Sequence, residues 1–385
     1  MSNAELVVGI DASRNRSGGA RRHLVSVLGA ADPRAYGIRQ VHVWSYASLL
    51  DALPDAPWLV RHGPPHLERS LLRQMWWQYR HQADEARAAG CDIMLYTDAG
   101  TLGRFRPCVV MSRDMLTYAP AEVSRYRFTR AWLRLWLRYY VQASAMRRAD
   151  GVVFLTDYAA AAIQPITGPL GRVAVISHGV GEEFRAVAPA AAPRELPRPV
   201  RCLYVSNVDR YKHQWHVVSA IAALRRKGHD VVLTLAGGGA GSAQARLDAE
   251  IARVDPDGTF VQSLGFVEPE HLPALLQRAD IFVFASSCEN MPNTLVEAMA
   301  AGLPIACSGR RPMPDILEDG GVYFEPEDPG SIARAIEELI VDDAARGARA
   351  RRAFDIARQF SWTRCADETW SFLRATAGAG AVMPS

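Results

Sequence analysis

The chain has 385 residues, of which 49% are hydrophobic and 22% charged, the composition of a globular protein with enough material for two cores. Its 44 basic and 41 acidic residues give a net charge of +3, which excludes a strongly basic nucleic-acid-binding protein. The six cysteines form no CxxC pair, and neither a signal-like N-terminal segment nor a run of about 18 apolar residues occurs. These features predict a cytoplasmic protein with reduced, buried thiols and without disulfides, a zinc site or a membrane-spanning helix.

Short apolar runs at the spacing of alternating strands and helices form two series. A Pro- and Ala-rich stretch, residues 186–200, separates them and is predicted to be a linker. We therefore predict an α/β fold of two Rossmann-like, doubly wound parallel-sheet domains, residues 1–185 and 201–360, facing a central cleft. Residues 361–385 are expected to form a tail and a C-terminal helix able to pack back on the N-terminal domain. The predicted strands are 7–11, 41–45, 92–97, 108–111, 151–156 and 173–178 in the first series, and 201–206, 231–237, 260–267, 281–286, 304–308 and 321–325 in the second.

Residues 125–148 form the most unusual helical pattern of the first series. On a helix that begins after Arg125, four arginines form one stripe about 80° wide, and six large apolar residues fill the opposite arc. Two interpretations stay open: the aromatic face packs in the domain core with the arginines in water, or the helix contacts an anionic membrane surface or a lipid-diphosphate acceptor. The arginines are Arg127, Arg130, Arg134 and Arg138, and the apolar residues are Phe128, Trp132, Leu135, Trp136, Tyr139 and Tyr140.

Residues 255–257 read DPD and superficially resemble a metal-binding DxD motif. The proline and the following Gly258 predict a surface turn instead. The ten histidines show no HExxH or other paired metal spacing, and His178 is expected in a loop beside the cleft rather than as a catalyst. No metal site is therefore predicted.

The stretch SSCENMPNTLVE (286–297) holds two glutamates around an Asn-Met-Pro-Asn core. On one helix, Glu289 and Glu297 would be separated by about 80° of rotation and roughly 12 Å of rise, too far to share one metal or proton. The apolar run before them predicts a buried strand, and Pro292 suits the first turn of a following helix with Asn290 as its N-cap. Such a helix start attracts phosphate, so one ligand could extend from the loop to the helix.

The order of motifs in the second half is more specific than any single motif. It runs YVSNVDRYKHQ (204–214), LAGGG (235–239), the stretch from LGFVEPEH to PIACS (264–308), and QFSW (359–362). This succession resembles the retaining GT-B glycosyltransferases of glycosyltransferase family 4, over nearly the whole C-terminal half. The first half resembles them more loosely through SGGARRH (17–23), FLTDYA (154–159) and ISHGVGEEF (176–184).

The resemblance implies roles for the matching positions. Glu297 matches the glutamate that holds the ribose hydroxyls of the nucleotide, and Glu289 matches the one near the donor sugar. Lys212 matches the lysine that neutralises the diphosphate leaving group. Backbone N–H groups are expected to bind sugar and diphosphate along the loop Asn290, Met291, Pro292, Asn293, Thr294 and Leu295, while Gly265, Phe266 and Val267 flank the base.

The sequence departs from the family pattern at two places. Asn207 stands where the family usually has an arginine, and either Arg210 supplies that charge or the site has one cation. Ser112, Arg113 and Asp114 stand where many relatives have a histidine, so Arg113 and Asp114 either line the acceptor or donor sugar pocket or form a salt bridge at a strand end. Gly18 and Gly19 match the glycine loop that approaches the diphosphate, although an ordinary turn explains a Gly-Gly pair as well.

The resemblance implies a retaining, metal-independent hexosyltransferase without a cofactor, of the bacterial surface polysaccharide, lipopolysaccharide or O-antigen type. Its expected partners are a GDP- or UDP-sugar, with mannose as one candidate, and a lipid-linked oligosaccharide or surface polysaccharide acceptor; none is a nucleic acid. The expected location is the cytoplasm, with peripheral contact at the inner face of the membrane through 125–148 as one option. Two alternatives stay open: a GT-B enzyme with a soluble acceptor, as in sucrose, trehalose or glycogen synthesis, and a catalytically silent nucleotide-sugar-binding subunit.

Overall fold

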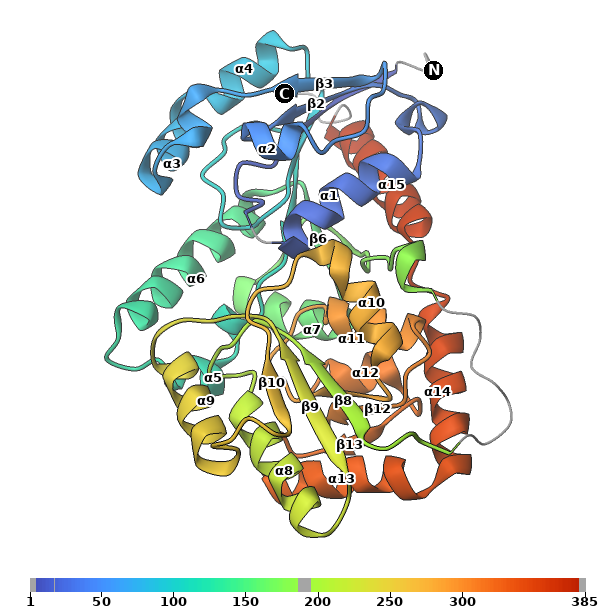
Figure 1. Ribbon diagram of the computed structural model, residues 1–385. Coiled ribbons are helices and arrows are strands. Elements are labelled where there is room, and N and C mark those ends of the chain that lie inside the picture. Colours follow the sequence, from blue (N-terminus) through green and yellow to red (C-terminus); the bar gives the residue numbers. More distant parts are fainter. Residues whose placement is uncertain (1–4, 17, 186–194, 381–385) are drawn as a thin grey trace. The chain divides into compact units, whose positions relative to one another are not determined.

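The computed structural model describes residues 5–16, 18–185 and 195–380, and the chain divides into two compact units (Figure 1). The first unit is Met1–Gly179 with Ser361–Ser385, and the second unit is Val180–Phe360. The turn η4 (Glu182–Phe184) belongs to the second unit because it packs against two helices there, so the division precedes the predicted boundary at residue 185. The predicted linker 186–200 lies mostly outside the described residues, as do residues 381–385 of the predicted tail.

The first unit contains a seven-stranded parallel sheet in the order β3-β2-β1-β4-β5-β6-β7. Its inner strands β4, β5 and β6 are buried throughout, as expected for apolar runs covered on both faces of a parallel sheet. Strand β3 was not predicted, because LVRH is a four-residue edge strand that carries an arginine and a histidine and forms no apolar run. The strands are β1 (Leu6–Asp11), β2 (Ile38–Trp44), β3 (Leu59–His62), β4 (Ile93–Tyr96), β5 (Cys108–Ser112), β6 (Gly151–Phe154) and β7 (Arg172–Val175).

The helices of the first unit connect these strands, and the C-terminal helix α15 joins them by packing against α1. The α-helices are α1 (Gly18–Ala30), α2 (Ala47–Leu50), α3 (Leu71–Arg80), α4 (Gln82–Ala88), α5 (Pro120–Ser124), α6 (Arg130–Arg148), α7 (Asp157–Thr167) and α15 (Trp362–Gly380). Short 3-10 turns are η1 (Pro33–Tyr36), η2 (Pro65–Glu68) and η3 (Leu116–Tyr118).

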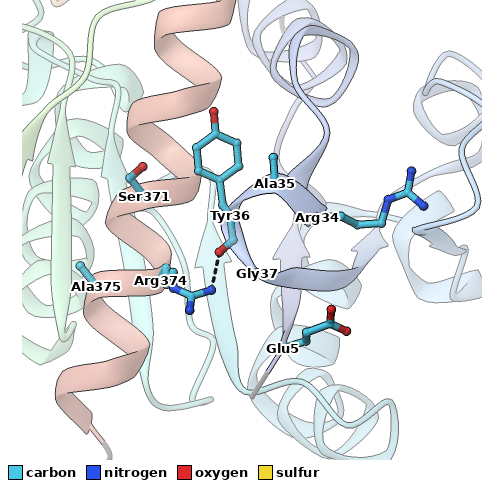
Figure 2. A pocket seen from close by; sticks show the side chains of 8 residues that line it. All are labelled: Glu5, Arg34, Ala35, Tyr36, Gly37, Ser371, Arg374 and Ala375. Carbon is cyan, nitrogen blue, oxygen red and sulfur yellow. Dashed lines mark hydrogen bonds between the residues drawn. The ribbon is translucent and has the colours of Figure 1, made fainter. Parts of the chain in front are cut away.

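Helix α15 is fastened to the first sheet by polar contacts with the turn before β2 (Figure 2). Arg374 donates a hydrogen bond to the carbonyl oxygen of Tyr36 (2.6 Å), and the Tyr36 hydroxyl donates to the Asp367 carboxylate, which raises the pKa of Tyr36 to about 12. Gly37 has φ +68°, and the Arg374 guanidinium fills the space that a Cβ there would need. A cavity of about 720 Å³ beside these residues lies at the amino edge of the sheet, whereas doubly wound sheets bind ligands at the carboxyl edge.

Helix α6 starts later than its arginine pattern predicts. Phe128 adopts the left-handed conformation (φ 62°), and the Thr129 side chain caps the helix by accepting a hydrogen bond from the Trp132 backbone N–H (3.3 Å). The helix therefore begins at Arg130, and Arg127 lies before it. The predicted four-arginine stripe is wrong in this respect: only three of its members are helical.

The second unit contains a six-stranded parallel sheet in the order β10-β9-β8-β11-β12-β13. The predicted strand 260–267 is mostly loop, since β10 covers three residues and Gly265 takes φ +64° two positions later. The strands are β8 (Val200–Val205), β9 (Val231–Ala236), β10 (Val261–Ser263), β11 (Ile281–Phe284), β12 (Ile305–Ser308) and β13 (Val322–Phe324). The helices are α8 (Gln214–Arg226), α9 (Gly241–Val254), α10 (Leu272–Arg278), α11 (Asn293–Ala300), α12 (Met313–Leu317), α13 (Pro329–Val341) and α14 (Asp343–Ala357), with the 3-10 turn η5 (Pro269–His271).

Both sheets have the strand order of doubly wound, dinucleotide-binding folds, so the predicted α/β fold of two Rossmann-like sheets is confirmed. All six cysteines are buried and free. None of the helices described is both long and apolar enough to cross a bilayer.

Candidate functional site

The candidate site lies where the second sheet reverses its winding direction. Strand β8 pairs with β9 on one side and with β11 on the other, so the loops after β8 and β11 leave from the same carboxyl edge. The first loop carries Lys212 and the second carries Glu289. Lys212 Nζ donates a hydrogen bond to the Glu289 carboxylate, and the two side chains are only 9% and 14% exposed. The fold thus joins two predicted catalytic residues that lie 77 positions apart.

The two loops are tied to each other by further hydrogen bonds. The Ser287 backbone N–H donates to the Tyr211 carbonyl oxygen (2.8 Å), and the Ser287 hydroxyl lies 2.9 Å from His213 Nε2. The buried Tyr204 hydroxyl donates to the carbonyl oxygen of Lys212 (2.6 Å). His213 adopts the left-handed conformation (φ 53°) just before α8. These contacts hold the Lys212 backbone in one position, which preorganises its side chain.

The ion pair lies in a poorly hydrated setting of aromatic rings. Lys212 Nζ is 5.1 Å from the centre of the Tyr211 ring and 5.7 Å from that of Phe284. Burial, with the nearby negative charge of Glu289, raises the pKa of the Tyr204 hydroxyl well above its ordinary value. Burial and Glu289 have the same effect on the pKa of Cys307. A charge placed here therefore acts strongly on its neighbours, because little water screens it.

Helix α11 begins beside this ion pair, although not at the predicted cap. The Pro292 carbonyl oxygen accepts hydrogen bonds from the backbone N–H groups of Leu295 (3.0 Å) and Val296 (3.2 Å), so Pro292 itself is the N-cap residue and Asn290 is not. Met291, Pro292 and Leu295 are buried, while Asn293 and Thr294 are partly exposed. Glu297 lies buried in the second turn, where it was predicted. The backbone N–H groups of the first turn face the same edge as Lys212.

Arg210 and Asn207 occupy the same loop but have different surroundings. The Arg210 guanidinium donates a hydrogen bond to the Ser242 hydroxyl (3.0 Å), in the first turn of α9. Asn207 is exposed, and its carbonyl oxygen accepts a hydrogen bond from the Gln214 side chain (2.9 Å). The Arg210 side chain is therefore directed toward α9.

Glycines bring three loops into close contact at this carboxyl edge. Gly237 has φ +127° and donates its backbone N–H to the Gly265 carbonyl oxygen (2.7 Å). A Cβ at Gly237 would lie 2.1 Å from the Ser206 carbonyl oxygen, so no larger residue fits. Next to Gly265, Phe266 is 74% exposed and Val267 is partly exposed. An exposed aromatic ring at the carboxyl edge offers a stacking surface for a flat ligand.

In the first unit, Gly18 and Gly19 are the first residues of α1 rather than part of a loop. Both are exposed, and no atom of the described residues lies within 4 Å of a Cβ built on Gly18. Steric crowding within the described residues therefore does not require glycine at position 18. The first turn of α1 leaves backbone N–H groups accessible, as a helix start does.

Asp114 forms an ion pair with α6, and not with Arg113. Its Oδ2 lies 3.2 Å from Arg138 Nε and accepts a hydrogen bond from the Thr117 hydroxyl. Arg138 also lies 3.8 Å from Asp98. The helical pattern predicts Arg138 in a stripe of arginines, and no motif in the sequence points to Asp98. Nothing in their spacing relates these residues, because they meet only when α6 packs beside the ends of β4 and β5.

Arg113 is the other predicted residue after β5, and its charge lies in a buried setting. Burial lowers the pKa of its guanidinium to about 10, although Asp98 opposes this shift. Its buried Nη1 has no hydrogen-bond partner among the described residues. A cation held in this way is a candidate for binding an anionic or hydroxyl-rich group of a substrate.

Comparison with known proteins identifies the family. Residues 193–356 match the family described as "Glycosyl transferases group 1". The chain is 30% identical over 292 residues to the glycogen synthase of Mycobacterium tuberculosis, a match that covers 70% of this chain and 69% of that protein. The chain belongs to the group 1 glycosyl transferases.

Two further relatives of this glycosyl transferase differ in how much of the chain they match. A segment of 110 residues is 34% identical to the O-antigen chain mannosyltransferase B of Escherichia coli and covers 29% of each chain. The structure of sucrose-phosphate synthase from Thermosynechococcus elongatus has a TM-score of 0.75 and 18% sequence identity, and the alignment covers 97% of this chain and all of that one. This likeness supports the fold and agrees with the predicted GT-B class.

In the DPD turn of the glycosyl transferase, the first aspartate stabilises the backbone of the turn. Asp255 is buried, and its carboxylate accepts hydrogen bonds from the backbone N–H groups of Thr259 (2.7 Å), Phe260 (2.9 Å) and Val261 (2.7 Å). Burial raises the pKa of Asp255, but these bonds outweigh it and the net pKa is lowered. The predicted turn is present, although Asp255 is not at the surface. Within the described residues, no cluster of three or more His, Cys, Asp or Glu side chains is placed to hold a metal.

His178 contributes to a packed aromatic cluster in the first unit. Its ring lies 4.5 Å from that of His23 and 5.8 Å from that of Trp362. Burial, with the nearby His178 and Arg113, lowers the pKa of His23 well below its ordinary value. His178 is thus buried between α1 and α15, which a sequence pattern does not reveal because these helices meet only in the folded unit.

Proposed function

We propose that this group 1 glycosyl transferase moves a sugar from a nucleoside-diphosphate sugar to an acceptor hydroxyl with retention of anomeric configuration. The bond between the sugar C1 and the diphosphate oxygen breaks, and a new C1–O bond forms with the acceptor. The acceptor proton passes to the departing diphosphate, on the same face of the sugar. Ser112, Arg113 and Asp114, which stand where many relatives have a histidine, include no convincing covalent nucleophile, and Glu289 is paired with Lys212, which favours this front-face route.

The observation that carries the proposal is the buried Lys212–Glu289 ion pair beside the start of α11. When the C1–O bond breaks, negative charge develops on the diphosphate. Lys212 and the backbone N–H groups at the start of α11 would stabilise that charge in a poorly hydrated setting. Arg210 would add a second positive charge from the neighbouring turn. A lysine in this place would also let the reaction proceed without a metal ion.

Donor recognition would use the residues around this ion pair. Glu297, buried in the second turn of α11, would accept hydrogen bonds from the two ribose hydroxyls. The loop 290–295 would bind the sugar and diphosphate through its backbone, with Glu289 near the sugar. The exposed Phe266, between Gly265 and Val267, would flank the base, which we propose to be guanine or uracil.

We propose a lipid-linked oligosaccharide or a growing surface polysaccharide as the acceptor and mannose as the first sugar to test, in the cytoplasm. The segment shared with O-antigen chain mannosyltransferase B supports this choice. Arg113, with its buried Nη1, and Asp114 are proposed to line the sugar or acceptor pocket. The longer match to glycogen synthase favours a second candidate, transfer to a soluble or polymeric glucan acceptor.

Calorimetric titration with GDP- and UDP-sugars tests the donor half directly. We expect saturable binding of one donor and at least a tenfold loss on Glu297→Ala, with no loss on the control Glu270→Ala, an exposed glutamate of η5. Absence of binding by every donor would refute the proposed function. Binding without turnover across lipid-linked and free-sugar acceptors would instead indicate a silent subunit.

Product analysis tests the remaining parts. The one-bond C1–H1 coupling constant of the new linkage, measured by NMR, should show the same anomeric configuration as in the donor sugar, and inversion would contradict the front-face route. Transfer should continue in the presence of EDTA. Loss of transfer that added Mg²⁺ restores would show that a metal takes part.

A further inference from the structure

Exposed apolar side chains are concentrated in two segments of the first unit. Fourteen large hydrophobic side chains are exposed in the described part of the chain; four of them lie on α3, and six lie between Phe128 and Tyr140. We call these ten the apolar–basic surface, because arginines lie among them. They are Leu71, Leu72, Trp76 and Tyr79 on α3, Phe128 just before α6, and Trp132, Leu133, Trp136, Leu137 and Tyr140 on α6.

One interpretation of the sequence packs the whole apolar arc of α6 in the core, and the structure differs: Leu135 is buried and Tyr139 is partly exposed, but the other four members are exposed. The helix instead buries Leu135 and four residues of its second half, Gln142, Ala143, Ala145 and Met146. With 3.6 residues per turn, the five exposed apolar residues from Trp132 to Tyr140 cover an arc of about 140°. Exposed Arg130 and Arg134 border this arc, whereas Arg138 faces Asp114.

Helix α3 repeats the same arrangement. Leu72, Trp76 and Tyr79 follow one another at spacings of four and three, on one exposed face. The opposite face buries Trp77, whose indole N–H donates a hydrogen bond to Glu85 (2.8 Å). The Arg104 guanidinium lies 4.9 Å from the centre of the Tyr79 ring. Both helices lie on the left side of the first unit in Figure 1.

The charge of these two helices differs from that of the whole chain. Neither helix contains an aspartate or glutamate, although the chain as a whole has 41 acidic residues against 44 basic ones. Their arginines are Arg73 and Arg80 on α3, and Arg130, Arg134, Arg138, Arg147 and Arg148 on α6. Tryptophan and tyrosine favour the interfacial zone of a bilayer, and arginines attract anionic headgroups.

We infer that the apolar–basic surface docks the protein on an anionic phospholipid bilayer, with the aromatic side chains in the interfacial zone and the arginines at the headgroup phosphates. A second copy of the chain fits this surface poorly, since a symmetric contact would bring arginines together without acidic partners. Neither helix has the length and apolarity to span the bilayer, so the contact is peripheral. The inference does not rest on the proposed function, because docking needs neither donor nor acceptor.

Vesicle sedimentation of the full chain tests the inference. We expect binding to vesicles of phosphatidylglycerol and phosphatidylcholine, and little binding to phosphatidylcholine alone. Each arginine near an anionic surface contributes a factor of about five, so Arg127→Gln/Arg130→Gln/Arg134→Gln should weaken partitioning about 100-fold. The triple variant Trp132→Ser/Trp136→Ser/Tyr140→Ser should also reduce binding at least tenfold. Circular dichroism checks that the variants remain folded.

A charge-matched control separates this surface from a general effect of net charge. Arg226, Arg278 and Arg358 are exposed in the second unit, and replacing all three with glutamine removes the same charge. Partitioning should then change by less than about threefold. Equal losses in both arginine variants, or unchanged binding in the aromatic variant, would overturn the inference. A dimer that the aromatic variant converts to monomer would assign the surface to a second copy instead.

The two proposals fail in different experiments. Vesicle binding without any nucleotide-sugar binding would refute only the proposed function. Transfer to a soluble acceptor by a protein that does not bind anionic vesicles would refute only the docking surface.

Discussion

Replacing Lys212 with alanine should lower both stability and the transfer rate, and a second variant can separate the two effects. The change leaves the Glu289 carboxylate without its partner, in a place where its side chain is only 14% exposed. Breaking a fully buried ion pair costs about 3–5 kcal/mol, and the residual exposure of both side chains places this pair lower, at about 2–3 kcal/mol. For a unit of this size the loss corresponds to a decrease in Tm of about 4–12 °C.

A second variant isolates the cause of that loss. In Lys212→Ala/Glu289→Gln the unpaired carboxylate becomes a neutral amide, which costs less to bury. We expect this double variant to regain at least half of the lost stability. Glycosyl transfer should nevertheless stay about 100- to 1,000-fold below wild type in both variants, because both lack the lysine that would stabilise the leaving group.

Urea unfolding, thermal melting and initial transfer rates measure these effects, and Lys227→Ala serves as the control. Lys227 forms an ion pair with Glu337 (2.8 Å), but its side chain is 55% exposed, so its loss should cost less than about 1 kcal/mol and leave transfer unchanged. A Lys212→Ala protein as stable as wild type would show that the pair is well hydrated. A transfer rate within tenfold of wild type would refute the role of Lys212 at the leaving group.

We expect three other substitutions to change nucleotide binding, stability or the pH dependence of stability. Phe266→Ala should weaken nucleotide binding about 5- to 100-fold, because the ring would stack on the base, and it should not lower Tm, because the ring is exposed. Unchanged affinity in calorimetry would show that Phe266 does not bind the nucleotide. Arg113→Met should raise the free energy of unfolding by about 1–3 kcal/mol, since it removes a buried hydrogen-bond donor that has no partner in the described residues. It should also lower the transfer rate. A less stable variant would show that the Arg113 guanidinium has hydrogen-bond partners. Asp255→Asn should destabilise the protein at pH 7. The folded-state pKa of Asp255 is lowered, so its contribution is present above the unfolded pKa and disappears as pH falls through the folded value, below about 3.8; a wild-type advantage that persists in urea titrations well below that pH would contradict this assignment.

Sequence patterns were informative wherever a local rule decides the structure. Buried parallel strands are continuous apolar runs, so IFVF in β11 and the core of most other strands could be recognised without a structure. The four-residue β3 escaped recognition because an edge strand needs no such run. Helix α11 was also predicted, but its start was misplaced, since Pro292 provides the first carbonyl acceptor and Asn290 does not cap it.

For the apolar–basic surface, local sequence patterns predict which residues share a helix face but not whether that face is buried. A helical period reveals that Trp132, Trp136 and Tyr140 share one face of α6. Whether that face packs inward depends on what else the fold brings against it, and here α6 uses Leu135 and its second half instead. Arg138, indistinguishable in sequence from Arg134, lies 3.2 Å from Asp114.

The sequence by itself determined the two-sheet fold class and the residue types of the candidate site, because periodicity and motif order are properties of the chain. Only the tertiary structure brought Lys212 against Glu289, buried Nη1 of Arg113 without a partner among the described residues, and left the ten side chains of the apolar–basic surface in solvent. The physical reason is that burial and pairing depend on contacts between segments far apart in sequence. Those contacts are set by the strand order at the reversal between β8 and β11 and by how α3 and α6 pack in their own unit.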